Sequence, residues 1–246
     1  MSTLDSVARE LKEPRRLSHQ LTTVLAAEIV SGRLAAGEQF PSTEAIVNRF
    51  SVSRTVARET VQGLAMLGLV RVQHGKRTEV LPEDEWDILS SIVQEALRNE
   101  GTAAPLLRDL YEFRLLIEPH AAALMAKNGS DDDLRRLSDL AGGMERIAEE
   151  EATPDAVLVA DREFHDLVAH ASENRVVHAV SRDIREIIST LWRLSHLGHE
   201  EARSVARQHR QIADAVVQRD ADAAAETMRA HLEWAAQADL DRSATP

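Results

Sequence analysis

The sequence from Gly37 to Val80 reads GEQFPSTEAIVNRFSVSRTVARETVQGLAMLGLVRVQHGKRTEV, and it decides the fold of the first part of the chain. Ser42 is a suitable N-cap for a short helix that ends at Phe50. Ser51-Val52-Ser53 then makes a tight turn, and the apolar spacing over 54–67 predicts a second helix. This order of helix, tight turn and helix is typical of a helix-turn-helix motif.

The periodicity changes after the second helix. Residues 69–73 and 77–81 alternate apolar and polar side chains, as strands do, and His74-Gly75-Lys76 forms the turn between them. Pro82 ends the second strand. A helix-turn-helix followed by a hairpin with a basic tip predicts a winged helix, with a further core-facing helix before it over 19–31.

Two arginines identify a candidate DNA-reading surface. Arg54 and Arg58 are i, i+4 neighbours near the start of the second helix, where a recognition helix meets base edges and phosphates. Two arginines on an exposed helix could instead simply be solvated. The joint presence of helix, turn and wing favours DNA binding.

The charge is distributed unevenly along the chain. Residues 1–82 carry 11 Lys and Arg against 8 Asp and Glu, whereas the whole chain has 29 against 41, so residues 83–246 hold 18 against 33. A basic N-terminal part followed by an acidic C-terminal part suggests that only residues 1–82 contact nucleic acid. The chain has no cysteine, no apolar run of membrane-spanning length and no signal-peptide pattern, so we expect a cytoplasmic protein with no membrane partner.

The remainder of the chain shows almost only helical periodicity. We predict a mostly α protein, with the winged helix in residues 1–82 and an all-α antiparallel bundle of six or seven helices in residues 83–246. The predicted helices lie at 84–99, 105–127, 131–150, 154–171, 174–196, 200–219 and 222–240. Two apolar stripes are expected to face the core: Leu106, Leu110, Phe113, Ile117 and Leu124, and Ile184, Ile187, Ile188 and Leu191.

A candidate metal site lies in the helical part. Asp161 and His165 share one side of a helix at i, i+4 spacing, and His209 and His231 lie on two later predicted helices. One carboxylate and three imidazoles that converge would suit a divalent transition metal such as Zn²⁺, Ni²⁺ or Mn²⁺. Each histidine taken alone could equally be a core or interface residue.

The N-terminal motifs resemble those of the GntR family of bacterial transcription regulators. The matching patterns are G-x-x-x-P-S from Gly37, V-S-R-T-x-x-R-E from Val52 and L-x-x-x-G-L-V from Leu64. The resemblance implies that Arg54, Thr55 and Arg58 contact DNA, and that the wing tip at His74, Gly75 and Lys76 enters the minor groove. The chain departs from the family at Glu44, where an arginine often touches DNA.

The C-terminal part resembles the FCD ligand-binding domain of the FadR subfamily. The shared pattern is E-x-R-x-x-x-E-P from Glu112, then D-x-x-x-H from Asp161, then two separated histidines. The resemblance implies that all four candidate ligands hold metal, and that Arg114 lines a cavity that binds a small organic acid. Arg114 could instead pair with Glu112 or Glu118.

These observations predict a regulator rather than an enzyme. We expect a transcription factor, most often a repressor in this family, that binds operator DNA as a homodimer and responds to a metal-associated carboxylate effector. A metal-sensing regulator is the first alternative, and a metallohydrolase with a DNA-binding appendage is a weaker one. The sequence does not identify the effector, the operator, the physiological metal or the regulated genes.

Overall fold

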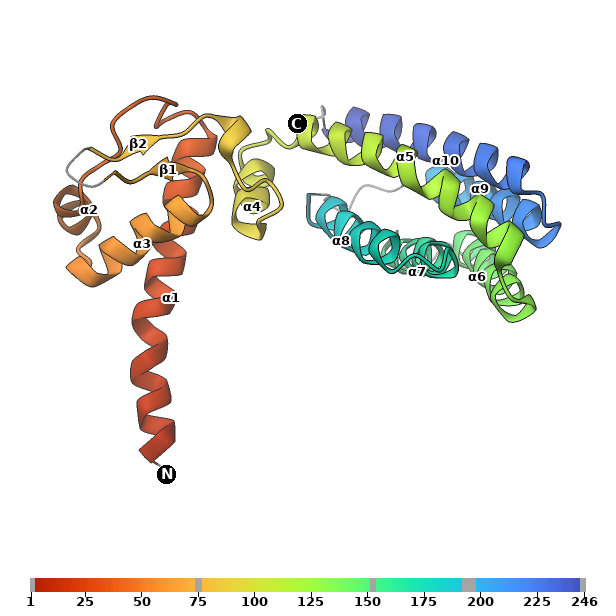
Figure 1. Ribbon diagram of the computed structural model, residues 1–246, viewed down its shortest axis with the longest axis horizontal. Helices are drawn as coiled ribbons and strands as arrows, with labels where there is room; N and C mark the ends of the chain where they lie inside the picture. Colours follow the sequence, from red (N-terminus) through yellow and green to blue (C-terminus); the bar gives the residue numbers. More distant parts are fainter. Residues whose placement is uncertain (1–2, 74–76, 151–153, 192–197, 244–246) are drawn as a thin grey trace. The chain divides into compact units, whose positions relative to one another are not determined.

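The computed structural model describes residues 3–73, 77–150, 154–191 and 198–243 (Figure 1). The chain divides into two compact units, Met1–Ala103 and Ala104–Pro246, and each is described by itself. The described residues are mainly helical, as predicted, and the sheet is limited to one short hairpin. Within the described part of the chain, no helix is both long enough and apolar enough to cross a bilayer.

The first unit is a winged helix with two additional helices. Its elements are α1 (Thr3–Val30), α2 (Thr43–Phe50), α3 (Arg54–Met66), β1 (Val70–Arg71), β2 (Glu79–Val80), a 3-10 turn η1 (Glu83–Glu85) and α4 (Ser91–Asn99). The two strands pair antiparallel, with Val70 opposite Val80. The predicted helix-turn-helix and wing strands are therefore present, although the strands are shorter than the alternating pattern suggested.

Local interactions set the ends of the two central helices. The Ser42 hydroxyl accepts a hydrogen bond from the Ala45 amide at the start of α2, and Ser53 does the same for Val56 at the start of α3. Ser51, between them, adopts a left-handed conformation with φ of 53°. Together these caps define a tight turn that directs the start of α3 to the surface, while Leu64 packs into the core.

Residues 83–103 belong to the first unit, whereas the sequence placed the domain boundary at 82/83. The predicted helix 84–99 is also interrupted, because Asp87 N donates to Leu67 O at 2.8 Å and Trp86 Nε1 donates to Leu81 O at 3.1 Å. α4 then packs on α1 through a buried apolar face that includes Val93 and Leu97.

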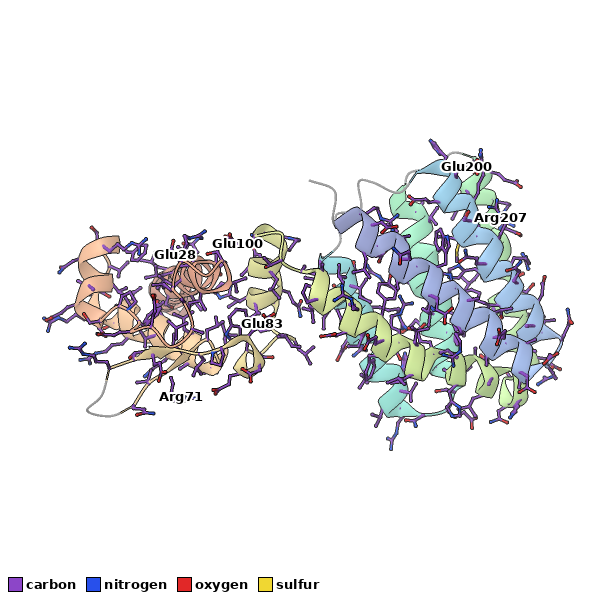
Figure 2. The ribbon with its side chains drawn as sticks, turned by 90° about the horizontal axis from the view of Figure 1, so that it is seen from above. Glu28, Arg71, Glu83, Glu100, Glu200 and Arg207 are labelled. Atoms are coloured by element: carbon purple, nitrogen blue, oxygen red, sulfur yellow. The ribbon has the colours of Figure 1, made fainter. Side chains whose placement is uncertain are left out.

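Ion pairs reinforce the packing of this segment. Arg33, just after α1, pairs with Glu28 and Glu100, and Arg71 on β1 pairs with Glu85 at 2.6 Å. Figure 2 labels Glu28, Glu100 and Arg71 on the first unit. Gly68, in the turn before β1, has a φ of +69°, and a Cβ there would lie 2.0 Å from the Glu85 carbonyl oxygen. The segment that follows the wing, which includes Glu85, therefore packs closely against β1 and the turn before it.

The second unit is a bundle whose described helices are α5 (Ala104–Asn128), α6 (Asp131–Glu149), α7 (Pro154–Ala171), α8 (Arg175–Leu191), α9 (His199–Val217) and α10 (Ala221–Ser243). α5 lies along α10, and α6 packs against α7 and α9 (Figure 1). Ser130 and Asp133 form the predicted capping box of α6. The apolar core of the bundle includes Met125, Leu137, Phe164 and Ile212.

The buried face of α5 differs from the predicted one. Phe113, Ile117 and Leu124 are only partly buried, whereas Tyr111, Arg114 and Glu118 are buried beside Leu106 and Leu110. The helix can bury these polar groups because the two charges, one turn apart, neutralise each other. The stripe predicted on α8, from Ile184 to Leu191, is buried as expected.

Candidate functional site

The start of α3 presents the predicted DNA-reading residues to the surface. Arg54, Thr55 and Arg58 are all exposed, while Val56 and Ala57 on the opposite side are buried. This arrangement keeps α3 firmly packed and leaves its first two turns accessible to a major groove. His74, Gly75 and Lys76 lie outside the described residues, so their role at the wing tip stays a prediction.

The two arginines of α3 differ in their electrostatic environment. Arg54 pairs with Glu44 of α2, with Nη2 3.4 Å from Oε1, and both side chains are largely exposed. Among the described residues Arg58 has no ion-pair partner. Arg54 therefore already has an anionic partner, whereas Arg58 does not.

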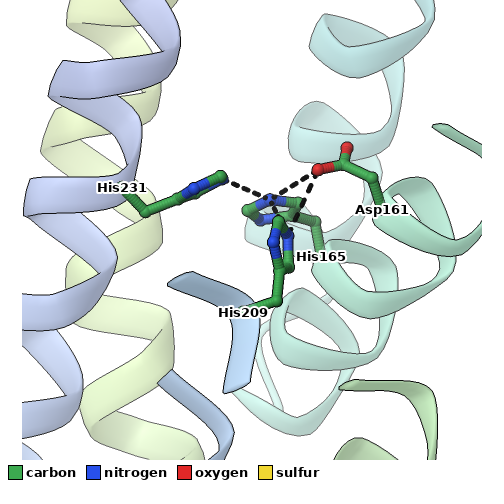
Figure 3. Close-up of side chains that lie close together, drawn as sticks. All are labelled: Asp161, His165, His209 and His231. Carbon is green, nitrogen blue, oxygen red and sulfur yellow. Dashed lines mark hydrogen bonds and ion pairs between the residues drawn. The ribbon is translucent and has the colours of Figure 1, made fainter. Parts of the chain in front are cut away.

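The four predicted metal ligands converge in the bundle (Figure 3). Asp161 and His165 come from α7, His209 from α9 and His231 from α10, and each residue offers a ligand atom within 4.8 Å of the others. The His165 Nε2 atom lies 3.2 Å from His209 Nε2 and 3.3 Å from His231 Nε2. The Asp161 Oδ1 atom lies 3.2 Å from His209 Nε2. All three imidazoles are buried.

Each imidazole has an acceptor oxygen close to its other nitrogen. His209 Nδ1 lies 2.8 Å from the Val205 carbonyl oxygen and His231 Nδ1 lies 2.8 Å from Gln208 Oε1. His165 Nδ1 lies 2.7 Å from Glu118 Oε2, which is an ion-pair contact without hydrogen-bond alignment. Acceptors at these distances favour a proton on Nδ1 and leave the Nε2 lone pairs directed into the cluster. This is the usual arrangement around histidines that ligate a metal.

Three of the distances, at 3.2–3.3 Å, fit neighbouring ligands of one metal ion, and all four ligand atoms lie within 4.8 Å of one another. For Zn–N bonds of about 2.05 Å, two ligands at a tetrahedral centre are separated by about 3.3 Å. Burial lowers the pKa of His165, but the Glu118 and Asp161 carboxylates raise it by more, so a metal ion at this position would take the place of a proton on that ring. Burial lowers the pKa of His231, and the neighbouring His209 and His165 lower it further, so this ring is neutral and able to ligate.

A buried charge network supports the cluster. Glu118 Oε1 accepts from Arg114 Nε at 2.7 Å, and Arg185 Nη1 lies 3.7 Å from the same oxygen. Burial would raise the pKa of Glu118, but the charges of Arg114 and His165 outweigh it and hold the pKa well below its usual range. Glu118 is therefore an anion that orients both Arg114 and His165.

A cavity of about 90 Å³ lies beside the cluster. Its walls include Arg114, Asp161, Arg185 and His231, together with a polar group formed by Tyr111, Asp239 and Arg242. Arg114, the predicted effector residue, does line this cavity, but its Nε is already bonded to Glu118.

Sequence reasoning missed Arg185. Its spacing relative to Ile184 and Ile188 places it on the buried face of α8, and a single arginine in an apolar stripe is the signal that could have identified it.

Comparison with known proteins identifies the family of both parts of the chain. Residues 17–80 match the gntR family of bacterial regulatory proteins, and residues 109–233, more than half of the chain, match the FCD domain. The chain belongs to the GntR family. It is a DNA-binding transcription regulator of the group that carries an FCD domain, and the metallohydrolase alternative is set aside.

Several curated regulators are similar to this GntR protein over most of their length. The galactonate operon transcriptional repressor of Escherichia coli is 24% identical, over 83% of this chain and 89% of its own. The regulator LutR of Bacillus subtilis is 28% identical, over 83% and 92%. The Exu regulon transcriptional regulator of E. coli is also 28% identical, over 91% and 84%.

Solved structures share the fold. The Listeria monocytogenes protein Lar has a TM-score of 0.59 at 17% identity, with 92% of this chain and 96% of that one covered. A GntR protein of Streptococcus agalactiae has a TM-score of 0.50 at 24% identity, over 90% and 99%. At these identities the likeness supports the fold alone.

Proposed function

We propose that this GntR regulator is a homodimeric repressor whose FCD domain binds a divalent transition metal and a small carboxylate effector. Asp161, His165, His209 and His231 would hold the metal. The observation that carries the proposal is the convergence of three buried Nε2 atoms, each on a ring whose Nδ1 lies within 2.8 Å of an acceptor oxygen.

The cavity beside the cluster supports a ligand with a negative charge. A bound ion would supply Lewis acidity and a coordination position for a carboxylate oxygen. Arg114 adds a fixed positive charge to the same cavity. One relative is named a galactonate operon repressor, and galactonate is a small carboxylate, which agrees with this class of effector.

The response to an effector would arise from differential binding. The cavity is lined by residues from α5, α7, α8, α9 and α10, so a ligand that fits one packing of these helices better than another shifts their equilibrium. α5 carries Arg114 and Glu118 and begins where the first unit ends in the sequence. A change in the position of α5 would therefore be passed along the chain toward the winged helix.

Elemental analysis and operator gel shifts test the proposal. Wild-type protein should contain about one equivalent of metal per chain after reconstitution, and His209→Ala should lose it, because the ligand set then falls from four to three. His178→Ala is the matched control, since His178 pairs with Asp166 outside the cluster. A wild-type protein that takes up no metal would refute the proposal.

Operator release separates two modes of regulation. Small carboxylates should release the operator from the metal-loaded protein, whereas release by metal alone, with no organic ligand, would favour the metal-sensing alternative.

A further inference from the structure

Arg185 is a buried cation whose hydrogen-bonding capacity is largely unused. Its side chain is 5% exposed, and Nη2 donates to Asp166 Oδ1 at 3.2 Å. Its Nε and Nη1 atoms are buried and have no hydrogen-bond partner within the described part of the chain. These two nitrogens carry three N–H bonds, and an unpaired buried donor is costly when its charge is retained.

The neighbouring carboxylates do not neutralise Arg185 fully. Glu118 bonds to Arg114 at 2.7 Å and reaches Arg185 only at 3.7 Å, which is too far for a hydrogen bond. Asp166 is nearly half exposed, so water weakens its field. Burial lowers the pKa of Arg185 and the charge of Arg114 lowers it further, opposed by Glu118 and Asp166.

Arg185 also lies where a ligand would be. It lines the same cavity as Arg114, Asp161 and His231, on the wall formed by α8. With a divalent ion in place, the positive charge of the ion, Arg114 and Arg185 would exceed the negative charge of Glu118, which is buried, and Asp161, which is partly exposed. Asp239, the other acidic residue of the cavity wall, pairs with Arg242 at 2.6 Å. A buried excess of positive charge is relieved most directly by an anion.

We propose that Arg185, through Nε and Nη1, is the main anchor for the anionic group of the ligand in this cavity. The ligand class is a small oxyanion, and a carboxylate is favoured because it can also reach the metal. Arg114 has the lesser role, since Glu118 already occupies its Nε. This inference rests on the proposed function for the cavity, but it concerns a residue that the sequence motifs do not single out.

The test measures anion binding to the full-length, metal-reconstituted protein. Acetate, citrate and inorganic phosphate are titrated by thermal shift and calorimetry against sodium chloride of equal ionic strength, with acetamide as the uncharged analogue of acetate. The wild type should bind at least one anion and not acetamide. Arg185→Gln should weaken that binding by about tenfold or more, because a charge-assisted hydrogen bond is lost.

Two further variants define the comparison. Arg185→Lys keeps the charge and should retain part of the affinity. Arg182→Gln is the matched control, because Arg182 lies one turn earlier on α8, is exposed, and contacts only Asp183 among the described residues. It should bind anions as the wild type does. A response to acetate and citrate alone identifies a carboxylate site, whereas a response that includes phosphate identifies a general oxyanion site.

The results separate this inference from the proposed function. Arg185→Gln with wild-type anion affinity, or a wild type that binds none of the three anions, overturns the role of Arg185. Absence of metal from the wild type overturns the metal proposal, while an Arg185-dependent anion affinity in that same protein still supports the anchor. If Arg185→Gln does not fold, NMR of the wild type replaces it. The arginine Nε–H resonance that is present in the wild-type spectrum and absent from that of Arg185→Lys is assigned to Arg185. That resonance must shift when the bound anion is added, and no shift overturns the inference.

Discussion

Replacing Glu118 by glutamine should destabilise the helical bundle and weaken its metal site together. Glu118 is 2% exposed and is the common partner of Arg114 Nε and His165 Nδ1, each at 2.7 Å. The glutamine side chain would keep the volume but remove the charge, leaving the buried guanidiniums of Arg114 and Arg185 without their shared anion. Breaking a buried ion pair by neutralising one partner typically costs about 3–5 kcal/mol.

This loss should be visible as a lower melting temperature. For a unit of 143 residues, about 3–5 kcal/mol corresponds to a fall of roughly 10–15 °C. Metal affinity should fall by about 10–100-fold, because a neutral amide oxygen would replace the carboxylate beside His165 Nδ1. Calorimetry of the reconstituted protein measures the first effect, and competition with a chelating dye measures the second. Glu112→Gln, on the exposed side of the same helix, is the control.

The pH dependence supplies an independent check. The pKa of Glu118 is lower in the folded protein than in the unfolded chain, so its stabilising contribution is fully present above the unfolded value of about 4.3. The contribution is lost only as the pH falls through the folded pKa. The difference between wild type and Glu118→Gln should therefore be constant near neutral pH and shrink in strong acid. A melting temperature within about 2 °C of the wild type at pH 7, with metal affinity intact, would refute the assigned role.

Two further predictions concern the first unit. Arg58→Ala should weaken specific operator binding by about 1–3 kcal/mol in gel shifts at matched salt and leave the bundle folded. Arg33→Ala is the control and should keep the operator affinity of the wild type, because Glu28 and Glu100 hold the Arg33 guanidinium. An Arg58→Ala variant with wild-type operator affinity would show that α3 is not the reading helix. Gly68→Ala should destabilise the first unit by more than Gly32→Ala in denaturant titrations, because both residues have a positive φ of about 70–75° but only Gly68 would also collide with the Glu85 carbonyl. Similar losses in the two variants would contradict that reasoning.

Features that depend on neighbouring residues were predictable from the sequence. The caps at Ser42 and Ser130 are where the sequence placed them, because each side chain bonds to an amide three residues later. Asp161 and His165 share a face for the same local reason. Whether His209 and His231 reach the same cluster depends on how α9 and α10 pack. Their place in the candidate metal site was suggested by the family resemblance rather than by spacing.

Features that depend on tertiary pairing were not predictable in this way. Apolar periodicity treats charged residues as exposed, so it directed Phe113 and Ile117 to the core and did not place Arg114 and Glu118 there. The pairing of these two charges, one of the alternatives left open by the sequence, neutralises them in the core. The same bias hid Arg185. The interruption of the predicted helix 84–99 also depends on distant partners, since Asp87 and Trp86 bond to residues on either side of the wing hairpin.

The pairing of Glu44 with Arg54 bears on how the regulator tolerates changes in its ionic surroundings. A cation that already has a carboxylate beside it exchanges one anionic partner for another when it meets a phosphate, so that contact displaces fewer condensed counterions from the DNA. The slope of the logarithm of the binding constant against the logarithm of the salt concentration becomes shallower by about 0.9 for each such contact. The loss of affinity over a tenfold rise in salt is then smaller by roughly eightfold. Operator occupancy should therefore vary less with salt concentration than in relatives whose recognition helix has two unpaired arginines, and the maximum affinity should be lower.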